Sequence, residues 1–216
     1  MKKLFNAIRK GDLGTVRTLL QKDPALIACT AQKPPAKDDG QSPLQVALKC
    51  GQFAIARKLL DCGADVHFME AEDCSNSWRM PVVQCAIMAA VMSTRWNTVR
   101  PDGEVEVYHT RETAEAAFDI LRQIMEKGAK IEQRDSFGNS CLQRALLDAR
   151  QILPVYDPIH GTVSGDRILT PELRCDLAKI FSLLLASGAD RNEFLPLTGK
   201  TIMETYGQEP VGEFLK

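Results

Sequence analysis

The sequence predicts an all-α solenoid of stacked helical hairpins, with one or two small β-hairpins inserted into it. Two observations and one physical argument predict this fold. The pair Gly-Ala closes an apolar helical stripe three times, at residues 63–64, 128–129 and 188–189. Similar turns open the stretches before them, as in GQSPLQVA from Gly40 and GNSCLQRA from Gly138. Because one helix pair cannot bury its apolar face alone, stacking of the pairs has to supply the stability.

We expect the whole chain to form one solenoid of five units whose first and last members are caps. The predicted units are residues 1–38, 39–70, 71–133, 134–194 and 195–216, all limits approximate. Within a unit, small residues such as alanine let neighbouring helices approach, and paired leucines supply the shared core. The glycine of each Gly-Ala pair stands where a helix ends in a left-handed residue.

The third and fourth units are longer than the second by the same amount. Pro43 precedes Gly63 by 20 positions, whereas 47 positions separate Pro81 from Gly128, and 47 separate Cys141 from Gly188. Two inserted segments, at about residues 93–112 and 151–172, account for the difference. A shift of 60 places Trp96 on Tyr156 and Thr110 on Thr170, which indicates a duplicated element.

The first inserted segment is predicted to be a β-hairpin. Val105 and Val107 alternate with glutamates, and the preceding PDG is a strong turn signal. The second segment alternates less clearly, so a hairpin and an irregular loop both stay open for it. Thr110 and Thr170 suit the N-caps of the helices that follow. An aromatic and apolar cluster is expected at this edge: Trp96, Tyr108, Tyr156 and Ile168.

The opening G-x-S-P-L-x-x-A from Gly40 and the closing L-L-x-x-G-A from Leu59 resemble the ankyrin repeat. The resemblance covers almost the whole chain outside the two inserted segments. The histidine of the family's T-P-L-H turn is missing, and Gln45 and Gln143 replace it in two units. The resemblance implies a module that binds another macromolecule without chemistry, through its concave face and the loops between repeats.

Composition and charge exclude several classes of protein. The 216 residues carry a net charge of −1, so no field attracts nucleic acid or an anionic membrane. No apolar run reaches the roughly 18 residues that a membrane span needs. Seven cysteines, an odd number without a CxxC pair, favour reduced thiols and a cytoplasmic location. Export as an effector by a route without a classical signal peptide stays open.

No residue is predicted to be catalytic, to hold a cofactor or to bind a metal. LTGKT from Leu197 has Phe194 where a phosphate-binding loop needs glycine, so it is interpreted as a turn. His67, His109 and His160 lack zinc-ligand spacing to other histidines or cysteines. A cysteine–histidine pair formed by distant residues stays open, because such partners need not be close in sequence.

The predicted function is that of a non-catalytic protein–protein interaction scaffold that binds a protein partner through its concave face and the edge made by the inserted segments. Two alternatives stay open: an enzyme or small-molecule site near those segments, and a structural protein that self-assembles by stacking through its terminal units. A weak homo-oligomer stays open as well. Aromatic and arginine side chains are enriched at binding hot spots. The predicted partner-binding residues are Trp78, Arg79, Trp96, Arg100, Tyr108, His109, Tyr156 and His160.

Overall fold

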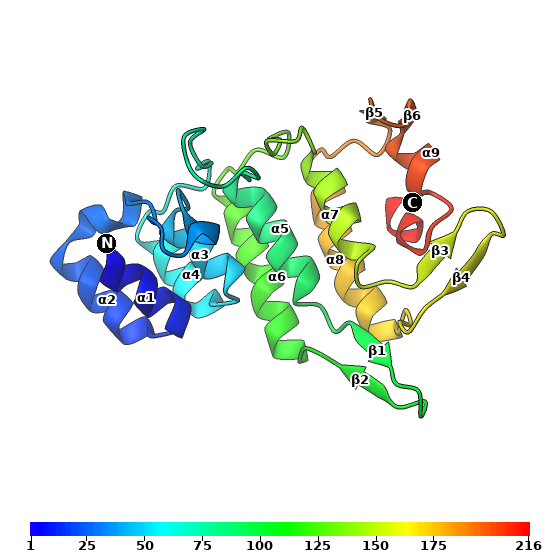
Figure 1. Ribbon diagram of the computed structural model, residues 1–216, viewed down its shortest axis with the longest axis horizontal. Helices are drawn as coiled ribbons and strands as arrows, with labels where there is room; N and C mark the ends of the chain where they lie inside the picture. The colour runs from blue at the N-terminus through cyan, green and yellow to red at the C-terminus, as the bar shows by residue number, and fades with distance from the viewer.

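The computed structural model describes residues 1–216 as a single row of helix pairs (Figure 1). The first helices of the pairs are α1 (Lys2–Lys10), α3 (Pro43–Lys49), α5 (Val82–Met92), α7 (Cys141–Ala149) and α9 (Ile202–Tyr206). The second helices are α2 (Leu13–Lys22), α4 (Phe53–Asp61), α6 (Arg111–Glu126) and α8 (Pro171–Ala186), and 3-10 turns lie at Pro24–Ala28, Ala36–Asp38 and Pro210–Leu215. This mostly helical repeat, with small antiparallel strand pairs, confirms the predicted fold class.

The helices form two layers. Helices α1, α3, α5 and α7 pack side by side in one layer, and α2, α4, α6 and α8 follow one another in the second. The chain ends lie at opposite ends of the row (Figure 1). One continuous cluster of buried apolar residues runs from Leu4 in α1 to Leu215 near the C-terminus. Each pair therefore shares its core with both neighbours, as a solenoid requires.

Helix α5 is apolar on every side because helices surround it. It contacts α3, α6, α7 and α8, and nine of its eleven residues are buried. Its one strongly polar residue, Gln84, is fully buried, and its Nε2 donates to the carbonyls of Gln133 and Asn139. Gln45 in α3 does the same for Met80, at 2.7 Å. Each of these glutamine side chains therefore joins the start of its own helix to the loop of the next unit.

The predicted helix ends are confirmed. Thr110 and Thr170 are N-caps whose side chains accept from Thr113 N–H and Leu173 N–H. After the second helices, Gly63, Gly128 and Gly188 have φ values of 84°, 89° and 98°. A left-handed residue at this point lets the chain turn back toward the next unit, and glycine adopts it without strain.

Both inserted segments contain a β-hairpin. Strand β1 (Asn97–Val99) pairs with β2 (Val105–Val107), and β3 (Val155–Asp157) pairs with β4 (Thr162–Ser164), both antiparallel. The second segment is therefore a hairpin and not an irregular loop. A third pair, β5 (Phe194–Leu195) with β6 (Lys200–Thr201), closes around the LTGK turn. The limits of the five units stay a prediction.

The predicted shift of 60 between the inserted segments is wrong for their strands. The N-caps Thr110 and Thr170 do lie 60 residues apart, but the N-caps of α5 and α7, Pro81 and Ser140, lie 59 apart. Strands β1 and β3 begin 58 residues apart. The residue of the second segment that is equivalent to Trp96 is therefore Pro154 and not Tyr156. The reason is local: α5 begins after its proline, and the connections differ in length.

Candidate interaction surfaces

Two edges of the row carry the segments that sequence reasoning singled out. The connections between units, residues 62–81, 127–140 and 187–201, lie at one end of the helices and are named the finger edge. The two hairpins and their arms, residues 93–110 and 150–170, project from the opposite end and are named the hairpin edge (Figure 1). Each edge is built by contacts between residues far apart in sequence.

At the hairpin edge, the two inserted segments lie against each other. Asn97, fully buried, donates from Nδ2 to the carbonyl of Ile168 at 2.9 Å and accepts the Ile168 N–H at 3.1 Å. The Val99 N–H donates to the carbonyl of Asp166. The arm 166–168 therefore runs along β1 on the side away from β2. This confirms that the two inserted segments lie side by side.

An ion pair fastens the start of the first inserted segment to helix α8. The Asp176 carboxylate accepts from the Arg95 backbone N–H, from its Nε at 2.9 Å and from its second guanidinium nitrogen at 2.7 Å. The Asp176 side chain is almost fully buried. Hydrogen bonding to this carboxylate raises the pKa of Arg95, which stays charged at every ordinary pH. The base of the first hairpin is thus held to the fourth helix pair.

The predicted aromatic cluster forms only in part. The rings of Trp96 and Tyr108 stack with centroids 4.0 Å apart, and the Arg167 guanidinium lies 5.9 Å from the Trp96 ring. Trp96 also donates from Nε1 to the carbonyl of Met92, so this half-buried residue closes the end of α5. Tyr156 lies elsewhere: with Arg150 and residues 209–211 it lines a cavity of about 80 Å³.

At the finger edge, Trp78 holds one finger to the next. Its Nε1 donates to Asp135 Oδ2 at 3.1 Å, and the guanidinium of Arg144 lies 5.0 Å from its ring. Beside it, Arg79 and Ser136 exchange hydrogen bonds through their main chains and the Ser136 hydroxyl. Trp78 therefore packs on the neighbouring finger and on α7, while 36% of its surface stays exposed.

Beneath Trp78, helix α7 carries a buried ion pair. The guanidinium of Arg144 donates to both oxygens of Asp148, at 2.9 and 2.7 Å, and both side chains are almost fully buried. Burial raises the pKa of Asp148 to about 6, although the charge and hydrogen bonds of Arg144 act in the opposite direction. The carboxylate is thus held ionised at pH 7 mainly by its one cationic neighbour.

This pKa makes the stability of the protein pH-dependent with an unusual sign. Between the ordinary pKa near 3.8 and the folded value near 6, the folded state binds more protons than the unfolded state. We therefore expect the contribution of Asp148 to the free energy of unfolding to fall by about 2 kcal/mol from pH 4 to pH 6. Urea unfolding of the wild type and Asp148→Asn at both pH values measures this. A difference between the two proteins that stays constant with pH contradicts it.

Apolar side chains point into solvent at the tips of the fingers. Phe137 is 68% exposed, Phe194 60% and Leu197 fully exposed. Between the last two fingers lies a cavity of about 230 Å³, lined by Ile131, Leu142 and Ala189 among others. The ion pair of Arg134 with Glu193, at 2.7 Å, joins the two fingers beside it. The finger edge therefore combines apolar tips with a partly polar hollow.

Residues 39–68 match the family model described as ankyrin repeat. These residues form an ankyrin repeat, and the chain resembles ankyrin-repeat proteins. It is also 29% identical over 149 residues to a transient receptor potential cation channel subfamily A member 1 homolog of Caenorhabditis elegans. The matched part is 66% of this chain but 11% of the channel homolog, so the chain spans a small fraction of that relative. None of the helices combines the length and the apolar character that a membrane span requires.

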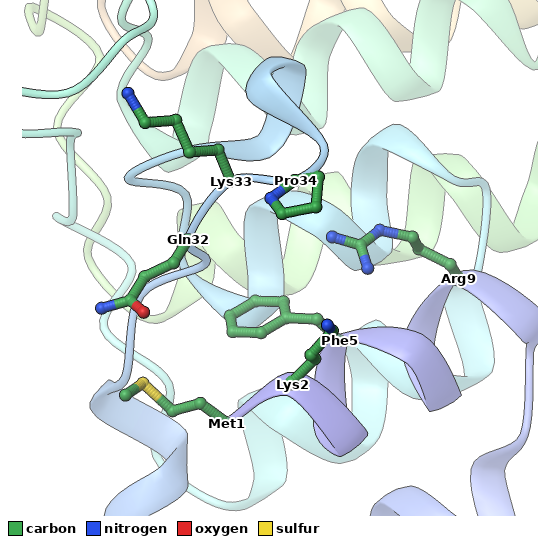
Figure 2. A pocket seen from close by; sticks show the side chains of 7 residues that line it. All are labelled: Met1, Lys2, Phe5, Arg9, Gln32, Lys33 and Pro34. Carbon is green, nitrogen blue, oxygen red and sulfur yellow. The ribbon is translucent and has the colours of Figure 1, made fainter.

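The first unit holds a cavity of about 110 Å³ (Figure 2). The Phe5 ring lines it, between Gln32 and Arg9 in this view (Figure 2). Two of its cations have partners: Arg9 donates to Asp38 at 2.7 Å, and Lys33 Nζ donates to the hydroxyl of Ser75. Lys2 also lines this cavity.

The remaining predicted contact residues lie on the hairpins and do not converge. Arg100 pairs with Glu104 and Glu106 on the first hairpin, and His160 pairs with Asp157 on the second. His109 makes no side-chain hydrogen bond. No group of three histidine, cysteine or acidic side chains is placed to hold a metal ion. Burial raises the pKa values of the Cys85 and Cys141 thiols to about 12, which makes both unreactive.

Sequence reasoning missed several residues that build these edges. Asp135 and the pair Arg144–Asp148 had no signal beyond the i, i+4 spacing of the pair, which is as common on solvated helices. Phe137 and Leu197 did carry one, because they are large apolar residues one and two positions before the glycine of a turn, where burial is rare. Asn97 carried none, since its partner Ile168 is 71 residues away.

Proposed function

We propose that this protein is a non-catalytic scaffold that binds a protein partner through its concave face, its finger edge and its hairpin edge. One observation carries the proposal. Apart from Met1, every exposed large apolar residue lies on one of the two edges. Those at the finger edge are Trp78, Phe137, Phe194 and Leu197, and those at the hairpin edge are Val105, Val107, Tyr108, Val155, Ile159, Val163 and Ile168.

Such a distribution is typical of a binding surface. Single exposed apolar residues are normal, but groups of them concentrated on particular faces mark sites where another protein docks. Ankyrin repeats generally act as protein-interaction modules and are typically non-enzymatic, which agrees with this reading. The seven cysteines are all unpaired, which supports a reducing, cytoplasmic location as part of the proposal.

The predicted contact residues divide into two groups under this proposal. Arg100, Tyr108 and His160 are exposed and are proposed to touch the partner directly. Arg79, His109 and Tyr156 are half-buried and are proposed as contacts at the rim. Trp78 and Trp96 hold the two edges in shape, so their substitution is expected to change both stability and binding.

A capture experiment with matched variants tests the proposal. The finger variant carries Phe137→Ser and Leu197→Ser, and the hairpin variant carries Val105→Thr and Val107→Thr. All four side chains are exposed, so we expect each substitution to change the free energy of unfolding by no more than about 0.5 kcal/mol. A control, Arg17→Ser with Gln21→Ser, changes exposed residues of α2 away from both edges.

The expected result is that one or more proteins bind the wild type and the control but bind the finger or the hairpin variant at least tenfold less. Quantitative mass spectrometry of the captured proteins measures this, followed by titration of the purified partner. If all four proteins capture the same set in the same amounts, neither edge is a binding surface and the proposal is wrong.

A further inference from the structure

We propose that the outer edge of β2 binds an extended, basic segment of the partner by strand addition, so that the segment becomes the next strand of the first hairpin. This inference rests on the proposed function and names the kind of partner that the hairpin edge takes. Four features of the hairpin support it: its unpaired backbone groups, the occupation of its other edge, its charge and its poor fit to a second copy.

The hydrogen-bond pattern determines which backbone groups of β2 are free. The Arg100 N–H donates to the Glu104 carbonyl, and the Tyr108 N–H donates to the Trp96 carbonyl. In an antiparallel pair, directly opposite residues alternate between bonded and non-bonded pairs. With the register Thr98 to Glu106, the N–H and C=O of Val105 and Val107 therefore point away from β1. No backbone or side-chain partner reaches them.

The opposite edge of the same hairpin is already filled. The Val99 N–H, which points away from β2, donates to the Asp166 carbonyl. The side-chain amide of Asn97 forms hydrogen bonds with both the N–H and the C=O of Ile168. Residues 166–168 thus already cover this edge of β1, through one main-chain hydrogen bond and the Asn97 side chain. The hairpin has one strand edge left, and that edge is β2. Open edges of this kind are templates for another strand, and such pairing is a recurrent mode of peptide recognition.

The side chains of β2 specify what the added strand carries. Val105 and Val107, 47% and 52% exposed, share one face of the hairpin. Glu104 and Glu106 lie on the other face, and Asp102 is in the turn. Arg100 is the one cation among these residues and pairs with both glutamates, so the hairpin keeps an excess of negative charge. A segment with β-branched residues opposite the valines and Lys or Arg opposite the glutamates complements it.

A second copy of this chain fits the edge poorly. Antiparallel pairing of two β2 strands about Glu106 places that residue opposite itself. Pairing about Val105 places Glu104 opposite Glu106 instead. Like charges directly opposite each other in a sheet are destabilising. The charge pattern thus favours a basic partner segment over a homodimer.

Three capped nine-residue peptides test the inference. The first alternates lysine and valine, the second alternates glutamate and valine, and the third is the first peptide with every valine nitrogen methylated. When the peptide's valines lie opposite Val105 and Val107, their N–H groups form the hydrogen bonds to β2. Methylation of these nitrogens therefore blocks the pairing without changing the charge of the peptide. The readout is the amide spectrum and hydrogen exchange of the isotope-labelled full chain.

We expect the lysine–valine peptide to bind at least tenfold more tightly than either other peptide. On binding, the amide signals of Val105 and Val107 shift and their exchange slows at least tenfold. The amides of Thr98 and Glu106, already in the ladder, keep their exchange rates. Equal binding of the three peptides, or shifts confined to the finger edge, would overturn the inference. So would slowed exchange of Val105 and Val107 that depends on protein concentration without peptide, since the occupant is then a second copy.

Two variants locate the binding on β2. Val107→Pro removes an outward N–H, which proline does without harm at a strand edge, and is expected to abolish binding. Val107→Thr keeps the N–H and is the matched comparison: it is expected to bind more tightly than Val107→Pro, although less tightly than the wild type. Glu106→Lys reverses the charge and is expected to bring the two unmethylated peptides to within threefold of each other. Binding that survives Val107→Pro and keeps its preference in Glu106→Lys would overturn the inference.

Failure of the inference and failure of the proposed function give different results. If no peptide binds β2 while partner capture still depends on the finger or hairpin variants, strand addition is wrong and the scaffold function stands. If capture is independent of both edges, the proposed function itself fails.

Discussion

Arg144→Met is expected to lower the free energy of unfolding by about 3–5 kcal/mol, because it leaves the carboxylate of Asp148 buried without a cation. Asp148 is 2% exposed, and its remaining contact, from Gln151 Nε2, is 3.4 Å long. Methionine keeps most of the volume of the arginine stem, so the loss is electrostatic and not a cavity. The Arg144 guanidinium also leaves the face of Trp78, which loosens the finger edge. Urea unfolding at pH 7 measures the change.

The double substitution Arg144→Met with Asp148→Leu separates the buried charge from the packing. Replacing both members of a buried ion pair with apolar residues of similar size is often neutral or stabilising. We expect the double variant to recover most of the stability lost in the single one. The single variant is also expected to be less destabilised at pH 5 than at pH 7, because the unpaired carboxyl then takes up a proton. A double variant as unstable as Arg144→Met would show that Arg144 acts through its shape.

Asn97→Ala is expected to cost about 1–3 kcal/mol and to separate the two hairpins. The substitution leaves the N–H of Ile168 without a partner, and an unsatisfied buried group costs about 1–3 kcal/mol. The C=O of Ile168 loses Asn97 Nδ2 but keeps the N–H of Thr170, at 3.1 Å. The arm 166–168 then loses its register against β1. The Val99 amide, which donates to Asp166, is expected to exchange at least tenfold faster. Hydrogen exchange and urea unfolding measure the two effects.

Thr98→Ala is the matched control for this prediction. Thr98 is the next residue of β1, and its hydroxyl bonds the exposed Tyr108 hydroxyl, so its loss is expected to change stability by less than about 1 kcal/mol. If the Val99 amide keeps its protection in Asn97→Ala, the main-chain bond alone holds the hairpins together. In that case Asn97 contributes only to the stability of its own segment.

The helix ends and the first hairpin were predictable because their signals are local. Thr110 and Thr170 cap helices through the main chain three residues later, and Gly128 and Gly188 turn the chain by their own backbone freedom. Val105 and Val107 indicated a strand through alternation alone. The interactions behind these predictions join residues only a few positions apart, so a short stretch of sequence contains both partners.

The register of the second inserted segment was not predictable in the same way. A constant shift from Thr110 to Thr170 places Trp96 on Tyr156, but β3 begins two residues earlier than that shift implies. Nothing in either segment alone reveals the difference, because no local signal determines the lengths of the arms that connect each hairpin to its helices. The contact of β1 with Asp166 and Ile168 selects the arrangement, and it joins residues about 70 positions apart.

By itself, the sequence determined the ankyrin-repeat solenoid, the ends of its helices and the presence of two inserted segments, since caps, turns and apolar stripes act over a few residues. Tertiary structure alone decided that Trp78 lies on Asp135 and Arg144, that Asn97 joins the two hairpins, and that the backbone of β2 is left open. Those outcomes depend on which distant groups meet once the helix pairs have stacked. Stacking brings together side chains whose spacing along the chain carries no periodic signal.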